Sequence, residues 1–446
     1  TQRICGVCPI SHGIASVLAQ EQAYHVEPPR NGLMLRNLVQ AGNAMMSHIM
    51  HFYHLSALDF LDITAITSYT GTDPQLQELK GWVQTQLRSK TLYPAAPFLP
   101  RYEGTYVDDV ELNVTGIKHY LDALRVRALC HKMIALFCGK VPHAPALMPG
   151  GITEHATVGN IAAYASLLKE VRTFIRESYV PDALAMAQAF PEYWELGKGY
   201  GNFLTYGAYS GSSTGLSYFP AGVIMDGSLA PFRETAITED VMYSLFSSPS
   251  GIPPTQSQTL PDAHKADAYS WIKAPRYDGK AMEVGPLARL LIAYQHDVEA
   301  VVNPLNTVLY QAGKTRNDLV SVMGRHLARA VETQILADLS TEWLHQLIPH
   351  ASTCRTVTIP QRARGVGLTE APRGALGHWL TIEDGAIAHY QCVVPTTWNC
   401  SPRDDQGQPG VIEHALVGTP VVYENHPLEV ARVVRSFDPC IACAVH

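Results

Sequence analysis

Two pairs of cysteines stand at opposite ends of the chain, each with the spacing Cys-x-x-Cys: Cys5 with Cys8, and Cys440 with Cys443. Two thiols three residues apart lie within one helical turn or tight loop and point the same way. Four thiolates together form a tetrahedral site for a soft transition metal. We therefore predict that the two ends of the chain meet at one buried metal centre.

These residue types also fit a structural zinc site. Zinc ribbons, however, close loops of tens of residues, whereas almost the whole chain separates the two pairs. Thioredoxin-like redox chemistry needs a single pair near a βαβ pattern, which the sequence does not show. A catalytic metal centre is therefore the better interpretation.

The second pair has features that prepare its thiols for metal binding. Asp438 is predicted to be the N-cap of a short helix and Pro439 its first residue, so that both sulfurs lie on the first turn. The helix dipole there favours anions and lowers the pKa of a thiol. A histidine follows each pair, His12 and the terminal His446, as a further ligand or as a hydrogen-bond partner of a ligand.

Arg373 is a candidate for the reacting centre. It stands between Pro372 and Gly374, where the chain can approach a site closely. Its guanidinium is always charged and offers a planar fork of donors, which suits the stabilisation of an anionic metal cluster or action at an open coordination position. The alternative interpretation is a surface arginine in a turn.

The remaining histidines and cysteines that stand out do not require a second metal site. His48, His51 and His54 recur every three residues, and we interpret them as polar side chains satisfied inside a packed bundle. The five scattered cysteines are interpreted as buried small apolar residues or spare thiols: Cys130, Cys138, Cys354, Cys392 and Cys400.

The elements that must position these residues are mainly helical. The stretch 31–62, apolar nearly all round, predicts a long helix buried on several sides. Residues 200–232 predict loops and short strands, and β-branched runs around the turn "EDGA" at 383–386 predict a hairpin. No linker separates domains, so the prediction is a single mainly α (α+β) domain over 1–446, a large helical bundle with small β excursions. Further helices are predicted at 74–90, 113–138, 155–190, 235–249, 282–313 and 317–348.

Composition restricts the class of protein. The chain has 446 residues, 46% apolar and 16% charged, which supports a large buried core and argues against disorder. The net charge of −7 with interspersed signs gives no reason to expect a nucleic-acid partner. No apolar run reaches the roughly 18 residues of a membrane span. The first residue is Thr1 and already lies in a motif, so we expect that the natural N-terminal segment is missing.

Taken together, the two cysteine motifs resemble the paired signature of a known family. "RICGVCPISH" with "DPCIACAVH" is similar to the large subunit of nickel–iron hydrogenases, and the interior is most similar to the respiratory uptake type. The resemblance covers essentially the whole chain, and it implies a helical bundle whose two ends converge on the metal centre. Four interior blocks resemble the family in the same order: "HFYHLSALD" at 51–59, "GGIT" at 150–153, "EAPRGALGHW" at 370–379 and "YQCVVPTTWN" at 390–399.

The resemblance implies a nickel–iron centre. Cys5 and Cys440 would be terminal ligands of nickel, and Cys8 and Cys443 would bridge nickel to an iron that carries one carbonyl and two cyanides. Dihydrogen is a weak acid, and its heterolytic cleavage needs a Lewis acid together with a base, which soft thiolates and their metals supply.

The resemblance also assigns the surroundings of the metals. Pro372, Pro395 and Thr396 would line the cyanide pocket, with the Thr396 hydroxyl as a donor. His446 and the backbone carbonyl of Cys392 would bind a magnesium (or iron) ion near the C-terminus. A third ligand of that ion, and a glutamate that relays protons, would belong to the missing N-terminal segment.

Four residues are implied to act in catalysis: Arg373, Asp438, His12 and Cys440. Asp438 would pair with Arg373, His12 would lie close to a bridging sulfur, and the proton would be relayed from the terminal thiol of Cys440. Many family members carry an aspartate where Ser47 stands here, so we expect a thinner carboxylate–arginine network above the metals.

The implied function is the reversible conversion of dihydrogen to protons and electrons. The electrons would pass to an iron–sulfur small subunit in a heterodimer, and from it to a membrane cytochrome b, on the periplasmic face of a membrane. An end at His446 resembles the mature form that a maturation protease leaves. The alternatives are a regulatory hydrogen sensor with low turnover and a hydrogenase-like subunit without its metal; the four retained cysteines argue against the second.

Overall fold

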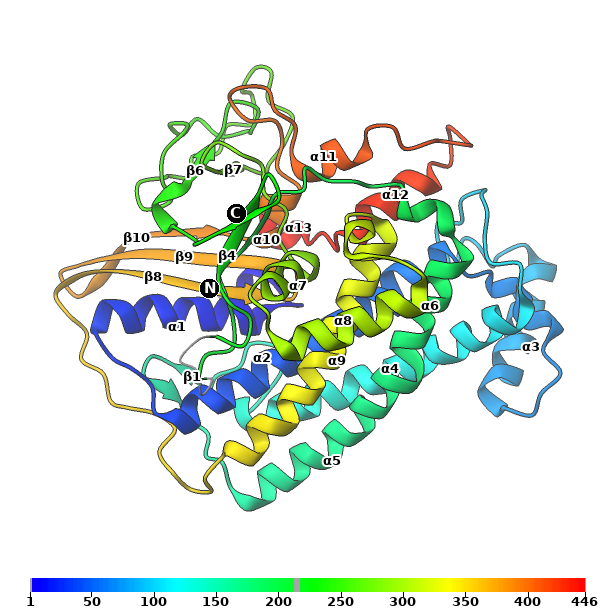
Figure 1. Ribbon diagram of the computed structural model, residues 1–446, viewed down its shortest axis with the longest axis horizontal. Coiled ribbons are helices and arrows are strands. Elements are labelled where there is room, and N and C mark those ends of the chain that lie inside the picture. Colours follow the sequence, from blue (N-terminus) through cyan, green and yellow to red (C-terminus); the bar gives the residue numbers. More distant parts are fainter. Residues whose placement is uncertain (1, 212–216, 446) are drawn as a thin grey trace.

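The computed structural model describes residues 2–211 and 217–445 (Figure 1). As predicted, helices dominate and the strands form small antiparallel sheets. Among the described helices, none combines the length and the apolarity that spanning a bilayer requires. The α-helices are α1 (Pro9–Tyr24), α2 (Arg30–Met50), α3 (Pro74–Ser89), α4 (Val110–Cys138), α5 (Val158–Phe174), α6 (Val180–Ala189), α7 (Pro286–Gln295), α8 (Glu299–Ala312), α9 (Val322–Gln346), α10 (Pro395–Asn399), α11 (Val411–Leu416), α12 (Leu428–Ser436) and α13 (Ile441–Ala444). The strands are β1 (Leu147–Met148), β2 (Gly151–Ile152), β3 (Phe203–Thr205), β4 (Gly222–Met225), β5 (Ser228–Ala230), β6 (Ile237–Asp240), β7 (Ala274–Tyr277), β8 (Arg362–Ala371), β9 (Gly374–Glu383) and β10 (Ala386–Val393).

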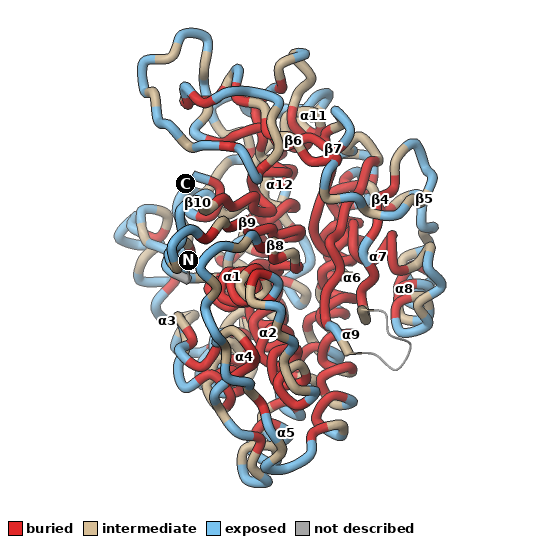
Figure 2. Tube along the Cα trace, turned by 90° about the vertical axis from the view of Figure 1, so that its left-hand side faces the viewer, coloured by how far each residue is buried: buried red, intermediate tan, exposed pale blue. Residues whose placement is uncertain are grey.

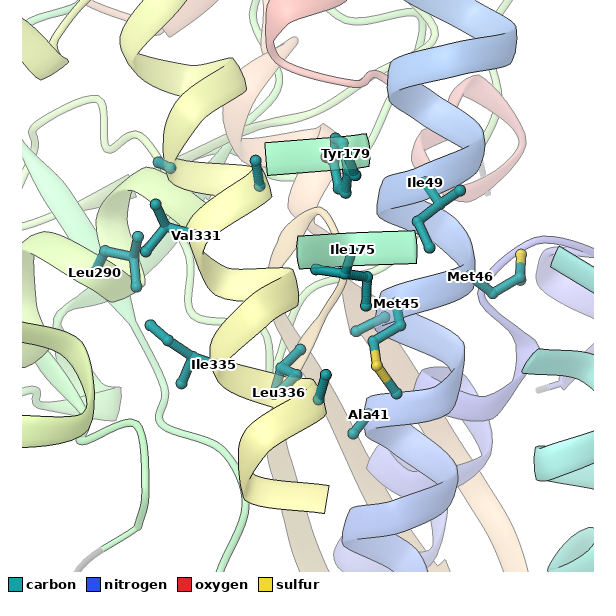
Figure 3. Close-up of a cluster of buried hydrophobic side chains, with 14 of the residues drawn as sticks. Ala41, Met45, Met46, Ile49, Ile175, Tyr179, Leu290, Val331, Ile335 and Leu336 are labelled. Carbon is teal, nitrogen blue, oxygen red and sulfur yellow. The ribbon is translucent and has the colours of Figure 1, made fainter. Parts of the chain in front are cut away.

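The centre of the bundle is built from α2 and α9, which pack against each other and are covered by α4, α5, α6 and α7. Almost every residue of α2 is buried, because helices enclose it on several sides (Figure 2). Figure 3 shows Ala41 and Met45 of α2 pointing toward Leu336 of α9, with Ile175 between the two helices. A helix that is apolar nearly all round is stable only in such a position.

Two π-helical turns meet beside this core. The turn His51–Ser56 extends α2, and the turn Ile175–Tyr179 joins α5 to α6. The ring centroids of Phe52 and Tyr179 lie 5.1 Å apart, so the two turns contact each other. The helices predicted at 31–62 and 155–190 are therefore present, but each contains a π turn, a feature frequent near functional sites.

A three-stranded antiparallel sheet, in the order β10–β9–β8, lies beside the bundle with α1 packed on it (Figure 1). The loop 384–385 joins β9 to β10, where the sequence predicts a hairpin. At the opposite end Ala371 pairs with Gly374. Pro372 and Arg373 therefore form a two-residue loop between β8 and β9, and this loop points into the protein, because both residues are buried.

Small residues let α1 approach the sheet closely. Ala15, Ala19 and Ala23 form a buried stripe on α1, one turn apart, opposite two glycines of β8. A Cβ at Gly365 would lie 1.9 Å from the carbonyl oxygen of Ala19, and a Cβ at Gly367 would lie 1.9 Å from that of Ala15. Backbone contacts this close hold the first cysteine pair, at the start of α1, against the sheet.

The helix predicted at 235–249 is wrong. Residues Glu234–Ala236 form a 3-10 turn, and β6 pairs with β7 instead. Glu239 on β6 is buried, its carboxylate accepts hydrogen bonds from the Gln391 amide at 3.0 and 2.9 Å, and it lies 3.8 Å from Nζ of Lys273. These tertiary contacts override a weak local preference for helix. The short strands β3, β4 and β5 lie within 200–232, as predicted.

Gly367→Ala tests the contact between α1 and the sheet. The added methyl group collides with the backbone of α1, so we expect a loss of about 1–3 kcal/mol in the free energy of unfolding, the usual size of an overpacking penalty. Chemical unfolding measures it. The control is Gly81→Ala in α3, which is exposed with nothing within 4 Å of a Cβ and should stabilise the protein by roughly 1 kcal/mol. An unchanged midpoint for Gly367→Ala would show that α1 moves away from the sheet freely.

Candidate metal centre

The two ends of the chain bring the four paired thiols together beside the sheet. Cys8 is the N-cap of α1, with Pro9 as the first helical residue, and Cys440 is the N-cap of α13, which contains Cys443. Across the pairs, Sγ of Cys5 lies 3.6 Å from Sγ of Cys440, and Sγ of Cys8 lies 3.2 Å from Sγ of Cys443. The predicted convergence is confirmed.

The spacing of the sulfurs fits a shared metal. The ligand atoms of Cys5, Cys8 and Cys443 all lie within 4.8 Å of one another, and all three residues are buried. All four thiols are free of disulfides. Metal–sulfur bonds near 2.3 Å at tetrahedral angles place sulfurs about 3.8 Å apart. The thiols therefore form a cradle of the right size and softness for a transition metal.

The surroundings favour the thiolate at Cys5 and Cys440, whereas hydrogen bonds with Cys440 raise the pKa of Cys8 and of Cys443 above the usual value. The backbone N–H groups of Val7 and Cys8 donate to Sγ of Cys5 at 3.2 and 3.3 Å. The hydrogen bond with Cys440 is the main cause that lowers the pKa of the Cys5 thiol well below its usual value. The hydrogen bond with Cys443 lowers the pKa of Cys440 to about 7. Thiolates this close repel one another, so a shared cation stabilises the cluster.

The predicted cap of the last helix is wrong. Asp438 has a left-handed backbone (φ 55°), α13 begins only at Ile441, and its N-cap Cys440 makes no side-chain cap bond. The carboxylate of Asp438 pairs with Arg373 instead, and the N–H of Cys440 donates to Oγ1 of Thr396 at 3.0 Å. A buried guanidinium attracts a carboxylate more strongly than a backbone N–H does, so the ion pair determines where Asp438 points.

Arg373 is buried at 5% exposure, so it is not a surface turn residue. Its Nε donates to the carbonyl of Asp438 at 2.8 Å, Nη2 donates to Oδ1 of the same residue at 2.9 Å, and Nη1 lies 3.4 Å from Oγ of Ser47. Burial alone would lower the pKa of Arg373, but the Asp438 carboxylate and nearby thiolates raise it above its usual value. The guanidinium is therefore a fixed, permanent charge beside the thiols.

The other predicted site residues lie around this cluster, with one outside the described part. Thr396 and Pro395 begin α10, which packs against α13. Cys392, on β10, belongs to the same buried cluster as Cys5, Cys8 and Cys443. His446 lies outside the described residues.

His12 lies one turn after Cys8 on α1. Its Nδ1 is 3.1 Å from Nε2 of His378, whose Nδ1 is 2.7 Å from the hydroxyl of Tyr390. These contacts fix the orientation of the His12 ring.

The three histidines at the end of α2 pair with separate partners. His48 contacts Glu332 at 3.1 Å, and His51 and His54 contact the carbonyl oxygens of Arg435 and Tyr120 at 2.7 and 3.2 Å. Burial lowers the pKa of His51 well below its usual value. Within the described part of the chain, the cysteine cluster is the one group with metal-ligand geometry, so these histidines form no second metal site. Each has a hydrogen-bond partner at Nε2, whereas Nδ1 of His48 and Nδ1 of His51 are buried without one among the residues that the structure describes.

The sequence analysis missed a buried ion cluster behind Arg373, formed by Arg289, Glu332 and Glu370. Arg289 makes ion pairs with both carboxylates at 2.7 Å. The sequence contained a signal for this cluster: Arg289 stands in the middle of the apolar run of α7, and Glu332 lies within α9. Charged residues in such positions are buried only when they are paired.

Comparisons with known proteins agree with this geometry. The family model described as nickel-dependent hydrogenase matches residues 1–446. The chain is 39% identical to the periplasmic [NiFeSe] hydrogenase large subunit of Desulfomicrobium baculatum, over 100% of this chain and 84% of that protein. It is 35% identical to the uptake hydrogenase large subunit of Rhizobium leguminosarum, over 100% of this chain and 86% of that protein. A solved [NiFeSe] hydrogenase variant from Desulfovibrio vulgaris Hildenborough superposes with a TM-score of 0.87 at 38% identity, covering 100% of this chain and 88% of that one.

Cys443→Ser tests the cradle. A hydroxyl is a poor ligand for a soft metal, so we expect the purified variant to hold less than about a tenth of the nickel and iron that the wild type holds. Elemental analysis per folded chain measures this. Cys354→Ser is the control. This half-buried thiol donates to the carbonyl of Arg355 and does not belong to the cysteine cluster, so its replacement should leave the metal content unchanged. Full nickel occupancy in Cys443→Ser would remove Cys443 from the ligand set.

Proposed function

The chain belongs to the nickel-dependent hydrogenase family, and we propose that its four paired cysteines hold the nickel–iron centre of this catalytic large subunit. The convergence of the thiols beside the buried Arg373–Asp438 ion pair carries this assignment. Cys5 and Cys440 are the proposed terminal ligands of nickel. Cys8 and Cys443 are the proposed bridges to an iron with one carbonyl and two cyanides.

When bound, the centre supplies a Lewis acid for the heterolytic cleavage of dihydrogen. Cys440 is the thiol best suited to take up the proton. It is half-buried, whereas Cys5, Cys8 and Cys443 are at most 3% exposed, so its sulfur is the most accessible of the four to a proton acceptor.

Arg373 supplies a fixed positive charge and directed donors. Asp438 holds its Nε and Nη2 groups, while among the described residues Nη1 contacts Oγ of Ser47 alone, at 3.4 Å. Nη1 is therefore the most weakly bound nitrogen of the guanidinium and is available to a reacting group. Ser47 in place of a carboxylate leaves Asp438 as the residue that balances the charge of Arg373.

The pocket for the iron ligands is proposed to consist of Pro372, Pro395 and Thr396. The two prolines offer walls without N–H groups. Oγ1 of Thr396 accepts the N–H of Cys440, which leaves its own proton free to be donated to a cyanide.

A second metal ion and a histidine beside a bridging sulfur complete the proposed site. The carbonyl of Cys392 and His446 are the proposed ligands of a magnesium (or iron) ion. His12, oriented by its contact with His378, is the proposed neighbour of a bridging sulfur.

The electrons are proposed to leave through an iron–sulfur small subunit in a heterodimer. The five other cysteines do not form a cluster with metal-ligand geometry within the described residues, so this chain offers no relay of its own there. A periplasmic location is supported by the periplasmic relative from Desulfomicrobium baculatum. Attachment to a membrane cytochrome b through the small subunit is proposed from the resemblance to uptake enzymes alone.

Infrared spectroscopy of the purified protein tests the composition of the centre. We expect bands of one metal-bound carbonyl and two cyanides, together with nickel and iron by elemental analysis and oxidation of dihydrogen with an artificial acceptor. One equivalent of zinc with no such bands would return the cysteines to a structural role. Intact bands with very low turnover would favour the regulatory sensor.

Arg373→Lys tests the catalytic role of the guanidinium. Lysine keeps the charge but loses the planar fork, so it cannot hold both groups of Asp438 and reach a reacting group at once. We expect turnover per bound nickel to fall by about 10²–10³, the usual effect of removing a preorganised donor at a reacting centre. Arg362→Lys, exposed at the far end of β8, is the control. Wild-type turnover with intact metals would make Arg373 a structural turn residue.

A further inference from the structure

The hairpin loop that carries Arg373 is buried, so its backbone carbonyl groups need donors from the protein. Arg289 on α7 supplies them. Its Nη1 donates to the carbonyl of Ala371 at 3.0 Å, and its Nη2 donates to the carbonyl of Pro372 at 3.0 Å. Arg289 therefore holds the stretch of backbone that leads directly into Arg373.

The guanidinium of Arg289 is itself held in one orientation by two carboxylates. Nε and Nη2 donate to the two oxygens of Glu332 at 2.9 and 2.7 Å, and Nη1 donates to Glu370 at 2.7 Å. With the two carbonyls, every N–H of the fork has an acceptor. Burial would raise the pKa of Glu332, but Arg289 and the hydrogen bond from His48 lower it to about 2, so this carboxylate stays charged.

The backbone of α7 also touches the loop. Gly285, the N-cap of α7, and Gly374 both have positive φ, 126° and 133°. A Cβ at Gly374 would lie 2.6 Å from the nitrogen of Gly285, and a Cβ at Gly285 would lie 3.0 Å from the carbonyl oxygen of Arg373. The start of α7 thus fits against the loop with no room for side chains between them.

We propose that Arg289 is a positioning residue for Arg373, and that it sets where the Arg373 guanidinium stands relative to the metal centre. Asp438 and Ser47 hold the far end of the Arg373 side chain, and Arg289 holds its backbone end. A lysine at position 289 has three donors in a tetrahedral arrangement and cannot serve two carboxylates and two carbonyls together. This inference rests on the proposed role of Arg373.

The chain contains a matched control, Arg36. It is equally buried, forms a bidentate pair with Glu21 at 2.9 and 2.6 Å, and donates to the carbonyls of Gly151 and Met148 at 2.8 and 2.9 Å. Arg36 thus makes the same kinds of bonds as Arg289, but to the segments β1 and β2 rather than to the Arg373 loop. Arg36→Lys measures the effect of losing such a fork on folding alone.

The experiment compares Arg289→Lys, Arg36→Lys and Arg373→Lys by unfolding midpoint, nickel content, infrared bands, kcat and KM for dihydrogen. We expect Arg289→Lys to lower kcat per bound nickel at least about tenfold, since misplacement of a catalytic group by about 1 Å can cost 10²-fold. KM should change less than about twofold, and the cyanide bands should shift, because the charge of Arg373 moves relative to them. Arg36→Lys should lower the unfolding midpoint to a similar extent without changing kcat or the bands.

The outcomes separate this inference from the proposed function. Slow turnover in Arg373→Lys with wild-type kcat and bands in Arg289→Lys would overturn the positioning role alone. Wild-type turnover in Arg373→Lys would overturn the proposed role of Arg373 itself. Where Arg289→Lys does not load nickel, Glu370→Gln removes one of the two anchors of Arg289 and should lower kcat per nickel by at least about threefold. Failure of both variants to load nickel, with Arg36→Lys intact, would make the cluster a support of the fold only.

Discussion

Four cysteine sulfurs from the two ends of the chain are held close together, with cross-pair distances of 3.6 and 3.2 Å, and the packing of the rest of the fold must maintain these distances. Closing a loop of nearly the whole chain costs roughly 5 kcal/mol from the logarithmic dependence on length. The packed bundle supplies the opposing stability. α1 is fixed to the sheet through glycine–alanine contacts, and α13 is fixed through α10. The positions of both cysteine pairs are thereby determined by elements that are themselves deeply buried, and a metal adds the charge that balances the sulfurs.

The need to balance buried charge also determines how the polar groups inside the bundle are arranged. Arg373 forms an ion pair with Asp438, and Arg289 forms ion pairs with Glu332 and Glu370. All of these side chains are nearly inaccessible to solvent. An unpaired charge in such a position costs several kcal/mol. Each arginine also donates to backbone carbonyls, so these ion pairs fix the course of the chain as well as its charge. Stability and the geometry of the site thus depend on the same bonds.

The sequence allowed those features to be predicted whose signal is local or chemically specific. The cysteine spacing indicated a shared metal, the turn at 383–386 indicated a hairpin, and the apolar stretch 31–62 indicated the central helix. The predictions at 235–249 and at Asp438 failed because partners distant in sequence, Gln391 and Arg373, determine the local structure there. Such partners cannot be read from a window of neighbouring residues.

The role of Arg289 could not be predicted from the sequence for a related reason. Its five N–H groups donate to acceptors on α9, on β8 and in the loop after β8, and these directions become visible only when α7, α9 and the β8–β9 hairpin are placed together.

The small sheet has a consequence for how such a protein can change during evolution. Arg373 lies in the loop between β8 and β9, His378 on β9 is the partner of His12, and Cys392 on β10 stands opposite His378 in the strand register. His378 and Cys392 therefore occupy one register position of the ladder, close to the loop that carries Arg373. A single-residue insertion in β9 before His378 would turn the His378 side chain to the opposite face and change its partner on β10. The distant loop at 384–385 leaves the ladder untouched, so gains and losses of length can accumulate there. Changes of length are therefore restricted at the end of the sheet that carries Arg373 and tolerated at the opposite end, in the loop at 384–385.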